Sequence, residues 1–205
     1  AIVRSAARKR YEIAVLRPGA AECEPSPEED SWGPLVEECK RLIARNRSTL
    51  LFVNSRRMAE KIAARINEGE ATPLAYAHHG ALSREIRAEV EQRLKDGELR
   101  AIVATNSLEM GIDIGSLDQV AMIQAPFSIS SAIQRVGRAG HQVGQASRAA
   151  LFPSHPHNFL EAAALAPAIL EQDIEPVRLV ECPLDVLAQT IVSMVGVGAW
   201  DIDRL

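Results

Sequence analysis

The sequence predicts an α/β domain whose sheet is parallel and covered by helices on both faces. Short apolar runs typical of buried strands alternate along residues 10–172 with segments whose apolar side chains recur at helical spacing. This alternation is typical of βαβ units, in which a helix crosses over between two parallel strands. Hydrophobic residues make up 47% of the chain, which is enough for a sizeable core.

Each strand and helix is predicted from a local pattern. The helix after the apolar run 49–53 can begin at Asn54 or Ser55, because both residue types are common helix caps. A later helix is capped by Ser83 and ends near Gly97, and its apolar residues recur every four positions. The predicted strands are 13–16, 49–53, 74–77, 101–104, 119–124 and 149–152. The predicted helices are 35–43, 55–66, 83–97, 128–136 and 156–172, with a solvated loop over 18–34.

The composition limits the classes of function. A chain of 205 residues holds one domain, or one domain and part of another. The net charge of -4 gives no global basic field, so any nucleic-acid binding must come from a local arrangement. Three widely spaced cysteines show no metal-ligand or disulfide pattern, and no apolar run is long enough for a bilayer. We therefore expect a cytoplasmic protein with no metal ligands and no membrane partner. Because the chain does not begin with Met, we expect it to be part of a longer protein.

The most distinctive stretch is the octet 134–141, Gln-Arg-Val-Gly-Arg-Ala-Gly-His. A guanidinium suits phosphate oxygens, and glycines let the backbone approach a ligand closely. We interpret the octet as a turn that aims Arg138 at a transferring phosphoryl group. An ordinary surface turn with an ion-pairing arginine is the alternative. The chain has no Gly-rich phosphate loop ending in Gly-Lys, which suggests that the other half of the site lies elsewhere.

A second polar segment, 103–115, also follows a predicted strand. Thr105 can cap a short helix, and its hydroxyl and the free N–H groups there suit a phosphate of a nucleic-acid backbone. Asp113 lies between two isoleucines, and a carboxylate in such a setting is usually paired. An arginine or a ribose hydroxyl is a candidate partner. A helix cap with a purely structural acid is the alternative.

Two further polar segments follow strands, where ligands of parallel sheets bind. Arg56 and Arg57 stand in the first turn of a helix, where an anionic partner would offset their repulsion from the helix dipole. Solvated arginines are the alternative. His78 and His79 precede Gly80, but no third metal ligand lies at useful spacing. Packed or hydrogen-bonded histidines are therefore favoured over a metal site.

Taken in order, these segments resemble the motifs of the second RecA-like domain of superfamily 2 helicases. Residues 52–57 resemble motif IV, 104–113 resemble motif V, and 134–141 resemble motif VI. His79 and Gly80, with Arg87 and 94–97, resemble the segment that follows motif IV. The details of 54–57, 109–115, 138–141 and 182–189 are similar to the large helicase-related (Lhr) group.

The resemblance implies a RecA-like three-layer domain with a mostly parallel sheet. Its leading strand and loop would occupy 1–33, and the helicase C-terminal domain proper would occupy 34–175. In the Lhr group a winged-helix domain follows the second motor domain. Residues 176–205, with a helix predicted from Pro183 to Met194, would be the truncated start of that domain.

The resemblance also implies a mechanism. ATP would bind between this domain and an N-terminal RecA-like domain, which would supply the phosphate loop, the Mg²⁺ ligands and the base. Arg138 would be the arginine finger, with Gln134 as its catalytic neighbour. The ATP-binding residues would be Gly111, Asp113, Arg135, Arg138 and His141. Single-stranded DNA or an RNA–DNA hybrid would contact Asn54, Ser55, Arg56, Arg57, His79, Gly80, Thr105 and Asn106.

The octet departs from many relatives at its end, because His141 stands where an arginine is common. More of the charge stabilisation should then fall on Arg138, with Arg135 as a less well aimed second candidate. We expect the parent protein to be an ATP-dependent helicase or translocase, and this chain alone to hydrolyse little ATP. Two alternatives stay open: a non-catalytic RecA-like module that binds nucleic acid or a partner, and another α/β nucleotide enzyme such as a transferase.

Overall fold

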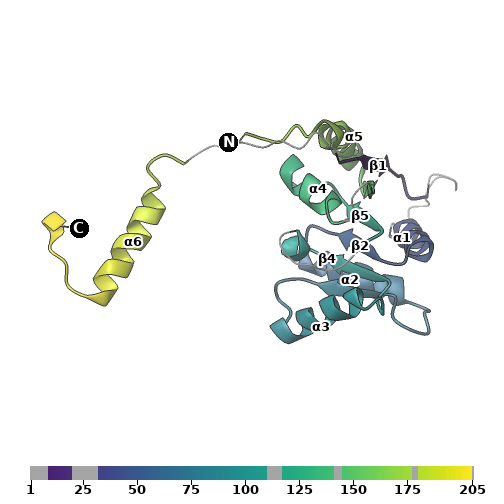
Figure 1. The fold of residues 1–205 in the computed structure, drawn as a ribbon, viewed down its shortest axis with the longest axis horizontal. Helices are drawn as coiled ribbons and strands as arrows, with labels where there is room; N and C mark the ends of the chain where they lie inside the picture. Colours follow the sequence, from purple (N-terminus) through teal and green to yellow (C-terminus); the bar gives the residue numbers. More distant parts are fainter. Residues whose placement is uncertain (1–8, 20–31, 110–116, 141–144, 177–179, 205) are drawn as a thin grey trace. The chain divides into compact units, whose positions relative to one another are not determined.

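A computed structural model describes residues 9–19, 32–109, 117–140, 145–176 and 180–204. The chain divides into two compact units, Ala1–Glu175 and Pro176–Leu205. The first unit contains the sheet and the helices that cover it, and the second contains one long helix (Figure 1). Each unit is described by itself.

The described part of the first unit contains a six-stranded sheet with the strand order β1-β6-β5-β2-β4-β3. Every strand pairing in it is parallel, so the predicted α/β class with a parallel sheet is confirmed. β2 lies in the middle, between β5 and β4. The strands are β1 (Tyr11–Val15), β2 (Thr49–Phe52), β3 (Ala75–His78), β4 (Ala101–Ala104), β5 (Gln119–Ile123) and β6 (Ser147–Phe152).

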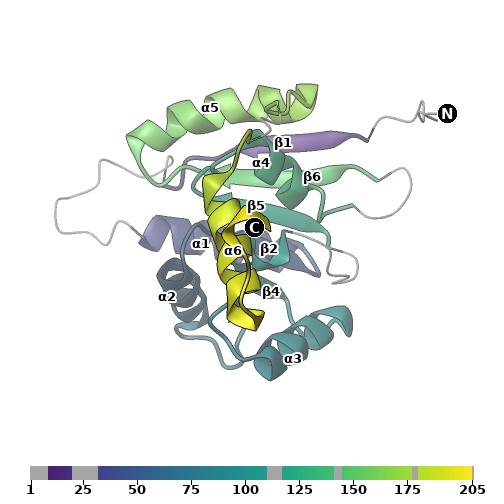
Figure 2. The same ribbon diagram turned by 90° about the vertical axis from the view of Figure 1, so that its left-hand side faces the viewer.

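Helices cover both faces of the sheet (Figure 2). The alternation of side chains along each strand explains why. In β2, Leu50 and Phe52 pack on the face covered by α3, α4 and α5, whereas Leu51 packs on the face covered by α1 and α2. All three side chains are fully buried, which requires a core on each side. The helices are α1 (Gly33–Arg45), α2 (Arg56–Asn67), α3 (Arg84–Lys95), α4 (Ile129–Val136) and α5 (Pro156–Glu171).

Serine caps fix where three of these helices begin. The Ser55 hydroxyl accepts a hydrogen bond from Met58 N at 3.2 Å, and the Ser83 hydroxyl accepts one from Ile86 N at 3.3 Å. Ser128 caps α4 in the same way. The expected cap at Thr105 differs: this residue precedes only a three-residue 3-10 helix, η1 (Asn106–Leu108), and its side chain makes no capping hydrogen bond. A single 3-10 turn leaves few unpaired amides for such a cap to satisfy.

The second unit contains α6 (Leu184–Val197) and a short 3-10 helix, η2 (Ile202–Arg204). The helix predicted from Pro183 to Met194 is therefore present, begins one residue later and continues three residues further. No residue of α6 is buried, although its apolar content is high. Among the described residues, no helix combines the length and the hydrophobicity that crossing a membrane requires.

Candidate functional site

The carboxyl ends of β2, β3 and β4 surround a hollow of about 440 Å³. These strands are neighbours in the sheet, so the residues that follow them lie together. Of the eight predicted nucleic-acid-binding residues, six line this hollow, and Arg57 and His79 do not. The lining residues are Asn54, Ser55, Arg56, Gly80, Ala81, Thr105 and Asn106.

The hollow is well supplied with hydrogen-bond donors. The first turn of α2 opens onto it at Ser55 and Arg56, both of which are exposed. Gly80 is exposed, and a Cβ there would meet no heavy atom within 4 Å, so the backbone is open to a close ligand. An N-terminal helix turn, a bare glycine backbone and hydroxyl groups form a surface suited to phosphate oxygens.

A second hollow of about 280 Å³ adjoins the first, because Asn54, Thr105 and Asn106 line both. Its other walls include Glu109, Ser131 and Arg135, together with the aromatic ring of Phe127. Phe127 is 90% exposed, and nothing in the sequence reasoning singled it out. The sequence did contain a signal for it: Phe127 is an aromatic residue that follows Pro126 and precedes the helix cap Ser128.

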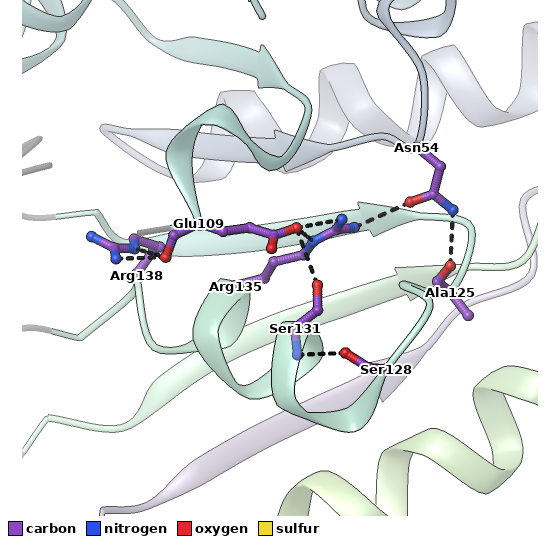
Figure 3. Close-up of polar contacts among 7 residues, drawn as sticks. All are labelled: Asn54, Glu109, Ala125, Ser128, Ser131, Arg135 and Arg138. Atoms are coloured by element: carbon purple, nitrogen blue, oxygen red, sulfur yellow. Dashed lines mark hydrogen bonds and ion pairs between the residues drawn. The ribbon is translucent and has the colours of Figure 1, made fainter. Parts of the chain in front are cut away.

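A buried ion pair joins the octet to the segment that follows β4. The Arg135 guanidinium donates to Glu109 Oε1 from Nε at 2.7 Å and lies 2.6 Å from it through Nη2 (Figure 3). The side chains are 3% and 13% exposed, respectively. Arg135 also lies 5.0 Å from the centroid of the Phe52 ring. A buried charge requires such pairing, so Arg135 is anchored inside the domain in this structure.

Asn54 extends this pair to the strand-end hollow. Its Oδ1 accepts from Arg135 Nη1 at 3.3 Å, and its Nδ2 donates to the carbonyl oxygen of Ala125 at 2.9 Å (Figure 3). The amide of one residue therefore ties the loops after β2 and β5 to α4. The sequence suggested Asn54 as a cap, but Ser55 caps α2 and leaves Asn54 to make these bonds.

Arg138 lies just beyond the end of α4 and is partly buried. Its Nε and Nη2 donate to the main-chain oxygen of Glu109 at 3.1 and 2.6 Å (Figure 3). Glu109 therefore holds Arg135 through its carboxylate and Arg138 through its backbone. Gln134, on the same helix, is exposed.

Gly140 forms the turn near the end of the octet. Its φ of +69° is the left-handed conformation that glycine adopts without strain, and a Cβ there would lie 2.6 Å from the carbonyl oxygen of Ala146. Gly137 differs from Gly140, because its φ of -60° and ψ of -15° are ordinary helical values. The turn that follows Arg138 therefore requires glycine at position 140.

The two histidines are packed side chains with carboxylate partners. His78 is fully buried, with Nδ1 2.9 Å from Ser107 Oγ and Nε2 2.9 Å from Glu91 Oε1. Burial lowers the pKa of His78, and the hydrogen bond with Glu91 opposes that shift. His79 Nε2 lies 2.7 Å from Glu60 Oε1.

Gly111, Asp113 and His141 lie outside the described residues, so their predicted roles in binding ATP stay predictions. Within the described ranges, no group of three or more His, Cys, Asp or Glu side chains is arranged to hold a metal ion. Sequence reasoning missed Glu109 as an organising residue. Its signal was an acid four residues after Thr105, in a chain where two arginines of the octet needed partners.

Comparisons with known proteins show which family the chain belongs to. A model of the helicase conserved C-terminal domain matches residues 34–142. The Lhr helicase/probable uracil glycosylase of Mycolicibacterium smegmatis is 40% identical over 205 residues, covering 84% of this chain and 14% of that protein. The ATP-dependent helicase Lhr-Core of Methanocaldococcus jannaschii is 36% identical over 197 residues, covering 96% of this chain and 23% of that protein.

A solved structure of an Lhr helicase is also similar to this chain. The Mycobacterium smegmatis helicase Lhr bound to ssDNA and AMP-PNP matches with a TM-score of 0.87 at 40% identity, over 96% of this chain and 26% of that one. The parallel sheet and the polar strand ends beside an arginine-bearing helix define a RecA-like domain. The chain belongs to the helicase conserved C-terminal domain family, as the second RecA-like domain of a superfamily 2 helicase of the Lhr group. It spans 14% and 23% of the length of the two relatives above.

Proposed function

We propose that this chain is the C-terminal motor domain of an ATP-dependent DNA or RNA–DNA helicase that moves along one strand. The chain of contacts from Asn54 through Arg135 and Glu109 to Arg138 is the observation that supports this most strongly. It runs from the donor-rich hollow to the arginine of the octet. A motor needs such a physical link between the strand that it grips and the nucleotide that it hydrolyses.

The strand-end hollow is the proposed track for the nucleic acid. Ser55, Gly80 and Thr105 offer hydroxyl and backbone donors around one concave surface, and Arg56 adds a positive charge at its edge. Contacts of this kind recognise phosphates and not bases, so we expect binding that is strong at low salt and independent of sequence. The relative named above was solved with ssDNA, which supports the choice of a single strand.

The octet is the proposed wall of the ATP site. Bound between two RecA-like domains, ATP would supply the phosphoryl group whose transfer to water drives the motor. Arg138 fits this site because it carries a permanent charge at the end of α4, where two hydrogen bonds to the main-chain oxygen of Glu109 hold its guanidinium. The carboxylate of Glu109 pairs with Arg135. This supports Arg138 as the finger and Arg135 as its structural neighbour.

Several further assignments belong to the proposal. We expect the phosphate loop, the Mg²⁺ ligands and the base on an N-terminal RecA-like domain, with Gln134, Gly111, Asp113 and His141 completing the ATP site. Residues 176–205 would begin a winged-helix domain, and the protein would work in the cytoplasm.

The test compares ATP hydrolysis by this chain with hydrolysis by the full-length protein, each with and without single-stranded DNA. We expect DNA-stimulated turnover by the full-length protein and almost none by the isolated chain. Comparable turnover by the isolated chain would overturn the two-domain site. A full-length protein that binds DNA without hydrolysing ATP would instead support a non-catalytic binding module.

A further inference from the structure

The N-terminus of α4 is held by a residue far away in the sequence. Glu175 Oε1 accepts a hydrogen bond from Ile129 N at 2.5 Å, and Glu175 Oε2 accepts one from Ser130 N at 3.1 Å. These amides are in the first turn of the helix, where no intrahelical acceptor exists. Ser128 satisfies the next amide, that of Ser131, at 3.0 Å. One carboxylate and one hydroxyl together therefore close the start of α4.

We call the two hydrogen bonds from Ile129 N and Ser130 N to the Glu175 carboxylate the clamp. The clamp is also electrostatically favourable. A negative charge beside the positive end of a helix dipole stabilises the helix, and two charge-assisted hydrogen bonds fix its direction. The hydrogen bond from Ile129 N is the main cause that lowers the pKa of Glu175 below its ordinary value. The carboxylate is therefore ionised throughout the pH range in which such a motor would work.

A turn after α5 brings Glu175 to the N-terminus of α4. Helix α5 ends at Glu171, and its C-cap residue Gln172 has a φ of 57° and a ψ of 38°, a left-handed conformation uncommon for a residue with a side chain. Asp173 N then donates to the carbonyl oxygen of Ala168. Two residues later the chain reaches α4, and Glu175 is also the last residue of the first compact unit.

Helix α4 carries Arg135 in its last turn, and Arg138 lies two residues beyond its end. The helix has eight residues and is therefore about 12 Å long. Because α4 is one short continuous helix, a displacement of its first turn also displaces its last turn. We infer that Glu175 is a positioning residue of the motor, which sets the place of Arg135 and Arg138 and links them to the point where the chain leaves the domain. This inference rests on the proposed function.

The test uses the full-length protein and replaces Glu175 with Ala, with Asp173→Ala as the matched control. Asp173 is an exposed carboxylate two residues away, and its side chain makes no hydrogen bond to any residue that the structure describes. Turnover and KM for ATP are measured with saturating single-stranded DNA. Amide hydrogen exchange of the peptide that covers 127–136 is measured on the same proteins.

For Glu175→Ala we expect kcat to fall five- to twentyfold, KM for ATP to stay within twofold, and exchange in the α4 peptide to rise at least fivefold. Asp173→Ala should resemble the unmodified protein in all three. Glu175→Asp, which keeps both acceptor oxygens and the charge, should recover at least half of the lost turnover. This rescue distinguishes positioning from a general loss of folding, which thermal melting would report.

Two results would overturn the inference. One is unchanged turnover and unchanged exchange in Glu175→Ala. The other is an unchanged kcat with a raised KM for ATP, because this pattern would place Glu175 in ATP binding. If the unmodified full-length protein showed no DNA-stimulated hydrolysis, the proposed function itself would fall. That outcome is separate, because the exchange comparison still reports whether Glu175 holds α4.

Discussion

The buried pair between Glu109 and Arg135 makes a strong prediction about stability. Replacing Glu109 with Ala removes the carboxylate and leaves a guanidinium that is only 3% exposed without its counter-charge. Removing one partner of a buried ion pair typically costs about 3–5 kcal/mol. The contacts of Arg135 with Asn54 and with the Phe52 ring exist already in the native state, so they do not offset that loss.

The size of this effect can be measured against the whole stability of a domain. A cost of 3–5 kcal/mol is a large part of the roughly 5–15 kcal/mol that holds an ordinary domain folded. For a chain of this size it corresponds to a melting temperature about 6–20 °C lower. The milder Glu109→Gln keeps the shape and one acceptor, so we expect about 1.5–3 kcal/mol, the range for a hydrogen bond to a charged group.

Urea unfolding of the 205-residue chain, followed by circular dichroism, measures these changes. Glu98→Ala is the matched control, because Glu98 pairs with Arg93 at 3.3 Å on the surface, with the side chains 59% and 35% exposed. An exposed pair is worth about 1 kcal/mol or less. Replacing Glu109 and Arg135 together with apolar residues should recover part of the loss, since no unpaired charge then remains. A cost for Glu109→Ala no larger than that of Glu98→Ala would refute the buried pair and place Arg135 in solvent.

Three further predictions follow from single positions. Gly140→Ala should cost about 2–4 kcal/mol in urea unfolding, because it strains a left-handed residue and drives a Cβ into the backbone of Ala146; a cost below about 1 kcal/mol would contradict the turn. Cys39 should resist alkylation in the folded chain while exposed Cys182 reacts, since burial raises the pKa of the Cys39 thiol to about 12, and peptide mass spectrometry distinguishes the two. Burial lowers the pKa of His78, so the unfolded chain binds its proton more readily, and stability should fall as the pH drops from about 7 to 5. His78→Gln should flatten that dependence, and an unchanged pH slope would show that His78 is not its source.

The sequence was sufficient to predict the fold because the strands in the middle of the sheet contain short apolar runs and three helices begin at serine caps. Residues 49–52 illustrate this: β2 is buried on both faces, which leaves a continuous apolar run visible in the sequence. The gathering of Ser55, Gly80 and Thr105 at one edge also followed, since the carboxyl ends of parallel strands share an edge.

The side-chain partners could not be predicted in the same way. Glu109 and Arg135 are 26 residues apart, and their pairing depends on how η1 and α4 pack across the sheet. Ile129 and Glu175 are 46 positions apart in the sequence, so the contact that holds the start of α4 is even harder to predict. Neither contact follows a local period, so only the three-dimensional packing reveals it. The role of Asn54 was missed for a related reason, because two adjacent residues could each cap α2 and only Ser55 does.

The most direct test of the central proposal is the turnover of the full-length protein with Arg138 replaced by Ala. Arginine fingers contribute about 10³–10⁵-fold to turnover, and they act on charge that develops during phosphoryl transfer. We therefore expect DNA-stimulated kcat to fall at least about a thousandfold, in line with that range, while the Kd of a non-hydrolysable ATP analogue changes less than about threefold. A loss of binding equal to the loss of turnover, or turnover within about tenfold of the unmodified protein, would contradict the assignment of Arg138.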